Sequence, residues 1–376
     1  MKVRLIIGKF STYGGAEAVA FRFARFLQSQ GLLKEVVCGR NEIEEFPGKV
    51  VSLGMLKPGR FLKTFSFNLR VNRYLSLVDN QNVVNFSFAK VENVDVYRNG
   101  GGTHLGFLKE SIKAYSGFEG LRKRITRFLN PVNHFNPRLE GGIFSSVKKI
   151  IAVSEKVKEE IVRFYGKKLE RKIEIIPNGI DVKRFSPEIK GKLRKEERKR
   201  LKYGKNDFVL GFASSNFKLK GLPILIEVLS DLPDNFKLLV AGGRNSKKYK
   251  ALAERIGVIQ RVKFLGKVRE MERFYAAIDC LVHPSFYDTF GNVVAEALSM
   301  EVPVVVSNNT GAKDLVVNGK VGYVVNVDRS EILKAILRVF ELNPDFSCVK
   351  LMSDEEVFRR YVSLAESVLE GRVEKT

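Results

Sequence analysis

The chain has 376 residues, of which 44% are hydrophobic and 28% charged, an ordinary globular composition with room for two domains. Its formal net charge of +23 indicates a polyanionic partner (nucleic acid, an anionic membrane or a phosphorylated substrate), or else a charged surface of the thermophile type. Three scattered cysteines argue against a disulfide framework or a zinc site, and no leader-like or ~18-residue apolar segment is visible, so we expect a cytoplasmic protein.

Short apolar runs rich in β-branched residues alternate with helical segments along the chain. In the first half, the strand-like runs 3–8 and 148–153 precede the helical segments 16–30 and 155–165. The second half continues with strand-like runs at 208–213, 236–241, 280–283 and 303–307, each followed by a helical segment (222–229, 247–256, 291–300 and 313–317). This alternation predicts an α/β protein with two doubly wound parallel sheets.

The first candidate site is the segment KFSTYGGAE, in which Gly14 and Gly15 lie between the first expected strand and the first helix. Backbone amides at a helix start favour an anion, and the missing side chains allow a substrate to approach the backbone. The pattern differs from the GxGxxG of dinucleotide-binding folds, which argues against a nicotinamide enzyme. A plain turn is the alternative interpretation.

A second candidate follows the strand-like residues 94–97 and reads RNGGGTH, residues 98–104. Its three glycines permit close approach of a substrate, which makes His104 the best candidate among three histidines for a polar catalytic contact. A structural role for His104 is the alternative, and we expect His283, which precedes a proline, to be structural.

Apolar residues recur at helical spacing between Leu105 and Phe128, with basic residues on the other faces. Gly117 and Gly120 interrupt this pattern, so we expect two shorter helices. The composition is typical of a helix that lies in a membrane interface, and packing of the stripe on the domain is the alternative. The side chains expected to bind the membrane are Phe107, Lys109, Lys113, Phe118, Arg122, Lys123, Arg124 and Arg127.

The two halves are separated by IIPNGIDVKRFSP, residues 175–187, where prolines and a glycine break regular structure. We therefore place the domain boundary near residue 170. The charge run 190–205 mixes signs at helical spacing, and we interpret it as a solvated helix face. Near the carboxyl end, residues 354–370 form an expected amphipathic helix whose apolar face needs a packing partner.

The segment SNFKLKG, residues 215–221, follows an expected strand of the second half. Lys218 and Lys220 beside Gly221 could hold a diphosphate beyond the carboxyl ends of a parallel sheet. The P-loop pattern of ATPases is missing. Ordinary surface lysines are the alternative.

The most specific segment is HPSFYDTFGNVVAEA, residues 283–297. Asp288 and Glu296 flank the start of a helix at Gly291, whose first amides can receive phosphate oxygens. Asp288 could hold sugar hydroxyls, and Glu296 could accept from ribose hydroxyls. Alternatively, Asp288 caps the helix and Glu296 is solvated, although the apolar neighbours of Glu296 indicate that it needs a partner.

Taken in order, the pieces YGGAE, IPNGID, KG, VAGG, the two carboxylates separated by seven residues and VPVVVS resemble the retaining glycosyltransferases of family 4 over nearly the whole chain. Within that family the similarity is to the glucosyltransferases of the lipopolysaccharide core. The resemblance implies the GT-B fold, with two Rossmann-like domains facing across a cleft. It also implies that residues 354–376 cross back to the N-terminal domain 1–169, and that residues 170–353 form the donor-binding domain.

The resemblance further implies residue roles. Lys220 would bind the diphosphate, and Asp288 would bind the donor sugar. Lys220, Asp288 and His104 are the expected catalytic residues. The other expected donor-binding residues are Gly15, Lys218, Gly291, Asn292, Val293 and Glu296. Two departures weaken the match, since relatives usually have Glu in place of Asp288 and Arg in place of Leu219.

We therefore expect a retaining enzyme, peripheral at the inner face of the plasma membrane, that transfers a hexose. In our interpretation glucose moves from a UDP-linked donor to a glycolipid acceptor such as the lipopolysaccharide core. No cofactor is expected besides the donor substrate. The resemblance also implies that no metal is needed, and the lack of a DxD motif in the sequence is consistent with this. The alternatives are a non-catalytic basic protein that binds nucleic acid or anionic membrane, and a nucleotide-sugar epimerase. A nucleic-acid partner is not expected, since an RNA-binding signature is missing.

Overall fold

The computed structural model describes residues 1–12, 14–57, 59–243 and 245–373, which form two compact units. The first unit contains residues 1–109, 116–179 and the segment from Asp354 onward, and the second contains residues 110–115 and 180–353. The expected boundary near residue 170 is therefore too early. Strand β7 (Ile173–Ile175) pairs with β6 (Lys149–Ala152), so the residues after 170 complete the first sheet.

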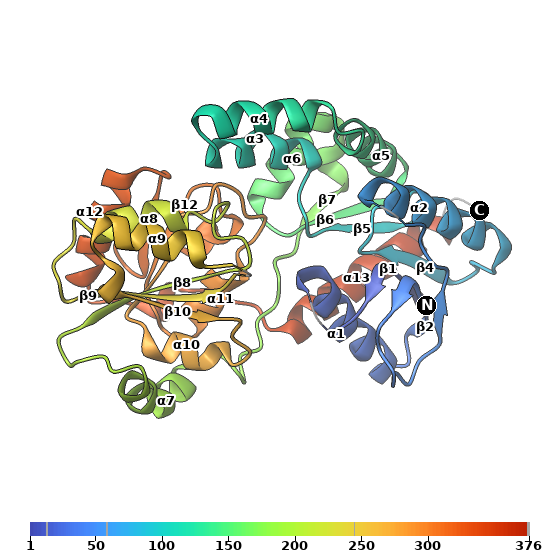
Figure 1. The fold of residues 1–376 in the computed structure, drawn as a ribbon. Coiled ribbons are helices and arrows are strands. Elements are labelled where there is room, and N and C mark those ends of the chain that lie inside the picture. Colours follow the sequence, from blue (N-terminus) through green and yellow to red (C-terminus); the bar gives the residue numbers. More distant parts are fainter. Residues whose placement is uncertain (13, 58, 244, 374–376) are drawn as a thin grey trace. The chain divides into compact units, whose positions relative to one another are not determined.

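The first unit is built on a parallel sheet with strand order β3-β2-β1-β4-β5-β6-β7 (Figure 1). In this order the first strand is central and the chain returns to build the other half, as in Rossmann folds. Central β1 pairs in parallel with both neighbours, so that Leu5 faces Val36 on one side and Phe86 on the other. Besides β6 and β7, the strands of this sheet are β1 (Lys2–Phe10), β2 (Leu33–Asn41), β3 (Val50–Ser52), β4 (Val83–Ser87) and β5 (Val96–Asn99).

Helix α13 (Asp354–Val373) returns from the second half of the chain and packs against α1 (Gly15–Ser29) and β4 of the first unit. The Tyr361 ring lies 5.3 Å from that of Phe23, and the Tyr361 hydroxyl accepts a 2.7 Å hydrogen bond from Arg98 Nε. The expected apolar face is buried as a whole: Val357, Tyr361, Leu364, Ala365 and Val368. Removal of this face from water explains why the last helix belongs to the first unit.

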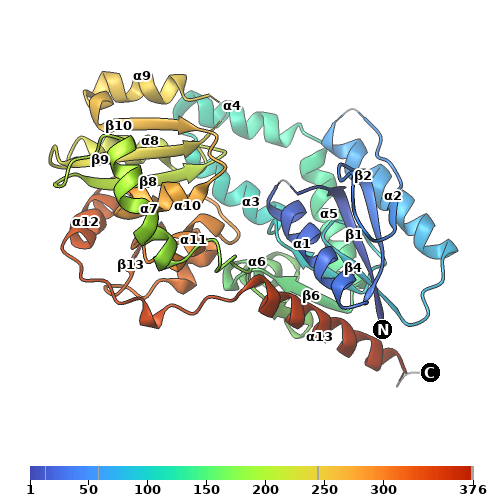
Figure 2. The same ribbon diagram turned by 90° about the horizontal axis from the view of Figure 1, so that it is seen from below.

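The other helices of the first unit connect its strands. Figures 1 and 2 show α5 between α2 and α4. Their bounds are α2 (Arg60–Leu77), α3 (His104–Ser111), α4 (Gly117–Phe128), α5 (Val132–Ser146), α6 (Glu155–Tyr165) and η2 (Lys167–Lys172), and the turn η1 (Ile112–Ala114) lies between α3 and α4 in the sequence. Residues 110–115, at the end of α3 and in η1, group with the second unit.

The second unit repeats the same architecture with a parallel sheet of order β10-β9-β8-β11-β12-β13. Its strands are β8 (Phe208–Ser214), β9 (Phe236–Gly242), β10 (Val262–Gly266), β11 (Cys280–His283), β12 (Val304–Ser307) and β13 (Gly322–Val325). Its helices are α7 (Pro187–Arg200), α8 (Leu222–Leu229), α9 (Lys247–Ile256), η3 (Ile259–Arg261), α10 (Met271–Ala277), α11 (Asn292–Ser299), η4 (Gly311–Leu315), α12 (Arg329–Phe340) and η5 (Phe346–Cys348). The helix expected at 313–317 is instead the short 3₁₀ turn η4. The strand order reverses between β8 and β11, where α/β folds usually bind ligands.

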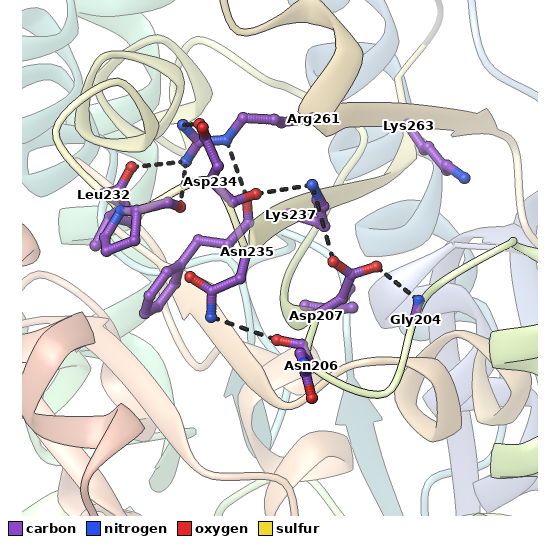
Figure 3. A network of polar contacts seen from close by, with 12 residues as sticks. Gly204, Asn206, Asp207, Leu232, Asp234, Asn235, Lys237, Arg261 and Lys263 are labelled. Carbon is purple, nitrogen blue, oxygen red and sulfur yellow. Dashed lines mark hydrogen bonds and ion pairs between the residues drawn. The ribbon is translucent and has the colours of Figure 1, made fainter.

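The amino-terminal ends of β8, β9 and β10 are held by a polar network (Figure 3). Arg261, just before β10, donates to the carbonyls of Leu229 at 2.7 Å and Leu232 at 3.0 Å, which close the end of α8. Lys237 donates to the Asp234 carbonyl at 2.7 Å and lies 3.8 Å from the Asp207 carboxylate. These contacts stabilise the sheet at the end opposite to the loops that carry the candidate site.

Candidate functional site

The loop after β8 meets the loop after β11 at the point where the strand order reverses. Gly221 has φ +83°, and a Cβ atom there would lie 2.2 Å from the Pro284 carbonyl oxygen. Only glycine fits this approach. Phe286 N donates to the Leu219 carbonyl at 2.9 Å, which joins the two loops a second time. The backbone therefore brings Lys220 next to the segment that carries Asp288.

Lys220 and Asp288 form an ion pair. Lys220 Nζ lies 2.6 Å from Asp288 Oδ2 and also donates to the Tyr287 carbonyl at 2.8 Å. His283 Nε2 lies 2.9 Å from the same carboxylate oxygen. Asp288 Oδ2 thus contacts both the Lys220 ammonium and the His283 ring. His283 therefore belongs to the candidate site, although its sequence context indicated a purely structural role.

Burial and charge act in opposite directions on these groups. Burial raises the pKa of Asp288, but the Lys220 charge and the His283 contact outweigh it and hold that pKa well below its usual range. Burial lowers the pKa of His283, which the Asp288 contact only partly offsets. Near neutral pH the arrangement is consequently a charged Asp288, a charged Lys220 and a neutral His283 that donates from Nε2. Within the described part of the chain, His283 Nδ1 has no hydrogen-bond partner.

Glu296 has the partner that its apolar surroundings require. The Tyr275 hydroxyl of α10 donates to Glu296 Oε2 at 2.7 Å. Burial, reinforced by the Glu296 charge, raises the pKa of Tyr275 well above its usual value. A tyrosine that stays protonated fixes the orientation of one carboxylate oxygen of Glu296 at the second turn of α11.

Helix α11 begins between the two carboxylates. Gly291 caps it with φ +99°, where a Cβ atom would lie 2.8 Å from Thr310 Cγ2. The amides of Asn292 and Val293 precede the first helical hydrogen bond, which Val294 N donates to the Gly291 carbonyl at 2.9 Å. A helix start of this kind favours an anion. Lys220 and Asp288 are therefore paired just before α11, and Gly291, Asn292, Val293 and Glu296 follow at its cap and in its first two turns.

Lys218 lies in the same loop as Lys220 and has an aromatic neighbour. Its Nζ is 4.5 Å from the centroid of the Tyr115 ring, a cation–π distance within the second unit. Neither the sequence of the loop nor its spacing indicated this contact. The resemblance implies an arginine at position 219, where this chain has Leu219, and Lys218 lies one position before it.

Two expected site residues belong to the first unit. Gly15 is the first residue of α1, and Tyr13 of the same motif lies outside the described residues. His104 begins α3, where its ring nitrogens contact Asn133 Oδ1 at 2.9 Å and Asn136 Nδ2 at 3.4 Å. Burial lowers the pKa of His104. Both ring nitrogens are thus occupied by amides of α5, and the catalytic role of His104 stays a prediction.

The segment expected to bind membrane divides into the three short elements α3, η1 and α4. On α4 the apolar side chains are exposed: Phe118 by 81%, Leu121 by 56%, Ile125 by 52% and Phe128 by 74%. Arg122 and Arg124 are exposed on the same helix, and Lys123 is half-buried. The described helices include none with the length and apolar character required to cross a membrane.

The remaining expected membrane residues are in different surroundings. Phe107 is half-buried and lies 5.7 Å from the guanidinium of Arg127, which also donates to the Leu108 carbonyl at 2.9 Å. Lys113 pairs with Glu110 at 2.6 Å within the second unit. Lys109 is exposed. Phe107 and Arg127 thus join α4 to α3, whereas Phe118, Arg122 and Arg124 are exposed, and membrane binding by this set stays a prediction.

Comparisons with known proteins agree with this architecture. Residues 13–184 match the model of "Glycosyltransferase Family 4", and residues 194–351 match that of "Glycosyl transferases group 1". D-inositol 3-phosphate glycosyltransferase of Xylanimonas cellulosilytica is 30% identical over 50% of this chain and 47% of its own length. Lipopolysaccharide glucosyltransferase WaaG of Escherichia coli is 28% identical over 50% of this chain and 52% of its own. Each of these alignments spans about half the length of the curated relative.

Solved structures extend the likeness to the whole chain at the level of the fold. A crystal structure of WaaG superposes with a TM-score of 0.75 at 21% identity, covering 98% of both chains. A structure of HepE from Anabaena in complex with UDP and glucose has a TM-score of 0.70 at 20% identity, covering 98% of this chain and 100% of HepE.

The two Rossmann-like units therefore define a GT-B glycosyltransferase fold, which confirms the predicted fold class. The resemblance to family 4 glycosyltransferases is confirmed at this level: the family 4 model matches the first half of the chain, the group 1 model matches the second half, and the two glycosyltransferase models together match most of its length.

Proposed function

We propose that the protein transfers a hexose, glucose in our interpretation, from a UDP-linked donor to a hydroxyl group of a membrane glycolipid, with retention of configuration. The observation that carries this proposal is the Lys220–Asp288 pair just before α11 together with the oriented Glu296 in the second turn of that helix. A cation and helix amides suit a diphosphate, and two oriented carboxylates suit sugar and ribose hydroxyls. The UDP and glucose of the HepE structure and the lipopolysaccharide role of WaaG support the choice of donor and acceptor.

In the proposed reaction the protein acts mainly by positioning and electrostatic stabilisation. The bond from the anomeric carbon to the diphosphate oxygen breaks, and the acceptor oxygen bonds on the same face of the sugar. Lys220 and the amides of Asn292 and Val293 stabilise the charge that develops on the leaving diphosphate. A diphosphate oxygen takes the acceptor proton. The sugar is oriented by Asp288, and no metal is required.

Association with the inner face of the plasma membrane is part of the proposal. The outward apolar residues of α4 next to Arg122 and Arg124 support it, because both apolar burial and attraction to anionic headgroups contribute at an interface. A protein bound to the membrane surface could reach an acceptor glycolipid in that membrane.

The proposal is tested first at donor binding. We expect UDP-glucose to raise the unfolding temperature more than GDP-, ADP- or CMP-sugars, since a ligand that binds only the native state stabilises it. Transfer of labelled glucose to lipopolysaccharide-core acceptors, with the anomeric configuration determined by NMR, tests the reaction. A protein that no nucleotide sugar stabilises would contradict the proposed donor.

The alternatives lead to different results. A nucleotide-sugar epimerase converts the donor to its epimer without an acceptor, which NMR of the donor alone detects. A non-catalytic basic protein binds polyanions in a salt-sensitive way and transfers nothing. Both alternatives lose support if glucose transfer requires a glycolipid acceptor.

A further inference from the structure

Helix α2 carries an exposed apolar stripe that the sequence pattern did not reveal. Phe65 is 44% exposed, Leu69 60% and Leu77 76%. These positions follow one another at multiples of four residues and therefore lie along one side of the helix, with exposed Arg73 between Leu69 and Leu77. The core-facing side of α2 is formed by other residues, namely Phe67, Val71 and Leu75, all buried. The exposed stripe is thus additional to the face that holds α2 in the fold.

The charge of α2 has a single sign. The helix contains Arg60, Lys63, Arg70 and Arg73 and no acidic residue. Arg73 is exposed within the apolar stripe, and Lys63 is exposed at another position of the same helix, whereas Arg70 donates to the Leu53 carbonyl at 2.7 Å. Exposed apolar side chains next to basic ones are the composition of a helix that lies in a membrane interface.

An aromatic path connects α2 with α4 through the start of α5, all within the first unit. The Phe65 and Phe135 ring centroids are 6.0 Å apart, and Phe61 lies 4.9 Å from Phe135. The neighbouring His134 contacts Phe128 at the end of α4, with ring centroids 6.0 Å apart and Nε2 2.7 Å from the Phe128 carbonyl oxygen. The two exposed stripes therefore adjoin through packed side chains of α5, which lies between α2 and α4 in Figures 1 and 2.

We propose that α2 is a second membrane-binding helix, which lies on the same anionic lipid surface as α4. The inference rests on the membrane association proposed above and extends it to a separate element. Charge favours lipid over a second copy of this chain, because two such basic faces would repel each other whereas anionic headgroups complement them. Two helices that bind one surface act together, since binding of the first raises the effective concentration for the second.

The absence of tryptophan from the chain permits a direct test. Single replacements Leu77→Trp on α2, Phe118→Trp on α4 and Phe340→Trp on the second unit as a control each introduce one fluorophore. Vesicles of phosphatidylcholine and phosphatidylglycerol should shift the Leu77→Trp and Phe118→Trp emission to shorter wavelength, and brominated acyl chains should quench it. The Phe340→Trp emission should not change. Unchanged Leu77→Trp emission on vesicles that shift Phe118→Trp overturns the inference and leaves the α4 proposal standing.

Binding of the same vesicles gives an independent measurement. Lys63→Gln with Arg73→Gln should lower the partition coefficient by about fivefold for each charge at low salt. Leu69→Ser with Leu77→Ser should lower it at low and high salt, whereas Leu337→Ser, an exposed leucine of the second unit, should not. If the α2 variants bind like the parent while α4 variants do not, the role of α2 is overturned. If the leucine variant instead converts a dimer to a monomer in sedimentation velocity, the stripe binds a second copy and the inference is also overturned.

Discussion

Lys220 Nζ lies 2.6 Å from Asp288 Oδ2, so the lysine proposed to hold the donor diphosphate is paired with the carboxylate proposed to hold the donor sugar. A diphosphate that binds Lys220 must therefore either share the lysine with Asp288 or displace the Asp288 carboxylate from it. The diphosphate also meets the negative charge of Asp288, whose low pKa keeps it ionised. Asp288 is therefore expected to favour binding of the donor sugar and to oppose binding of the donor diphosphate.

We expect Asp288→Asn to strengthen the binding of UDP itself while it weakens glucose transfer. Loss of the like charge releases Lys220 for the diphosphate, an effect of ~1 kcal/mol or about fivefold in affinity. Calorimetric titration with UDP measures it, with Asp288→Glu as the charge-preserving control. Lys220→Ala should act in the opposite sense and lower UDP affinity about tenfold, since a charge-assisted contact is lost. UDP affinity that is unchanged in both Asp288→Asn and Lys220→Ala would remove the pair from the donor site.

The contact between Tyr275 and Glu296 gives a second prediction. Tyr275→Phe should weaken UDP binding roughly threefold to tenfold, because Glu296 loses the hydroxyl that orients it at 2.7 Å. Because Tyr275 is buried, the unfolding temperature must be measured alongside affinity. The deoxyribose analogue of UDP distinguishes the cause, since it should bind parent and variant almost equally if Glu296 serves the ribose.

The periodicity of the sequence predicted the fold well. The runs at 222–229, 247–256 and 280–283 coincide with α8, α9 and β11 because apolar spacing and flanking breakers act locally. The boundary was misplaced because β7 is only three residues long and gives little signal before the loop that follows. The prediction of a helix at 313–317 was wrong for a similar reason, because the sequence of so short a segment does not distinguish a 3₁₀ turn from an α-helix.

The candidate site was less predictable than the fold. Helix spacing located Asp288 and Glu296 on either side of a helix start, but their partners lie elsewhere in the sequence. Tyr275 precedes Glu296 by twenty-one positions and comes from another helix. The contact of His283 with Asp288 depends on the course of the loop between them, which no local pattern fixes. The apolar neighbours of Glu296 in the sequence indicated that this carboxylate needs a partner. They did not indicate that the partner is Tyr275.

Acid should destabilise the protein through its histidines. Burial lowers the folded-state pKa of His283 and of His104 below the ordinary value of about 6.5. Between the folded and unfolded pKa values the unfolded chain binds more protons, so the free energy of unfolding should fall as pH decreases below about 6.5. Denaturant titrations at about pH 7 and about pH 5 measure this decrease. His283→Gln should remove part of the dependence, and an equal dependence in parent and variant would contradict the assignment to His283.

Metal removal should leave activity intact. The proposed diphosphate site uses Lys220 and helix amides, and the described residues contain no group of three or more His, Cys, Asp or Glu side chains that could hold an ion. Glucose transfer measured with EDTA should therefore equal the rate without it. Loss of activity on chelation, restored by Mg²⁺ or Mn²⁺, would mean that the proposed diphosphate site is misassigned.

The exposed face of α4 gives the last prediction. Replacing Arg122, Lys123 and Arg124 by Gln should reduce binding to anionic vesicles by about fivefold for each charge near the surface, and the loss should shrink as salt screens the parent's charges. Phe118→Ser should reduce binding even at high salt, because its side chain is 81% exposed and would insert among the acyl chains. Arg127→Gln and Phe107→Ser should instead lower the unfolding temperature, since these side chains hold α4 on α3.

Vesicle co-sedimentation at several phosphatidylglycerol fractions and salt concentrations separates these effects, with calorimetric UDP binding as the control for an intact second unit. The basic residues and Phe118 should act together, because an interface needs both headgroup attraction and apolar burial. Electrostatic adsorption alone would make Phe118→Ser bind like the parent while the charge variant does not. If both variants sediment with anionic vesicles as well as the parent does, α4 does not bind membrane, and its exposed apolar residues and the net charge of +23 require another explanation.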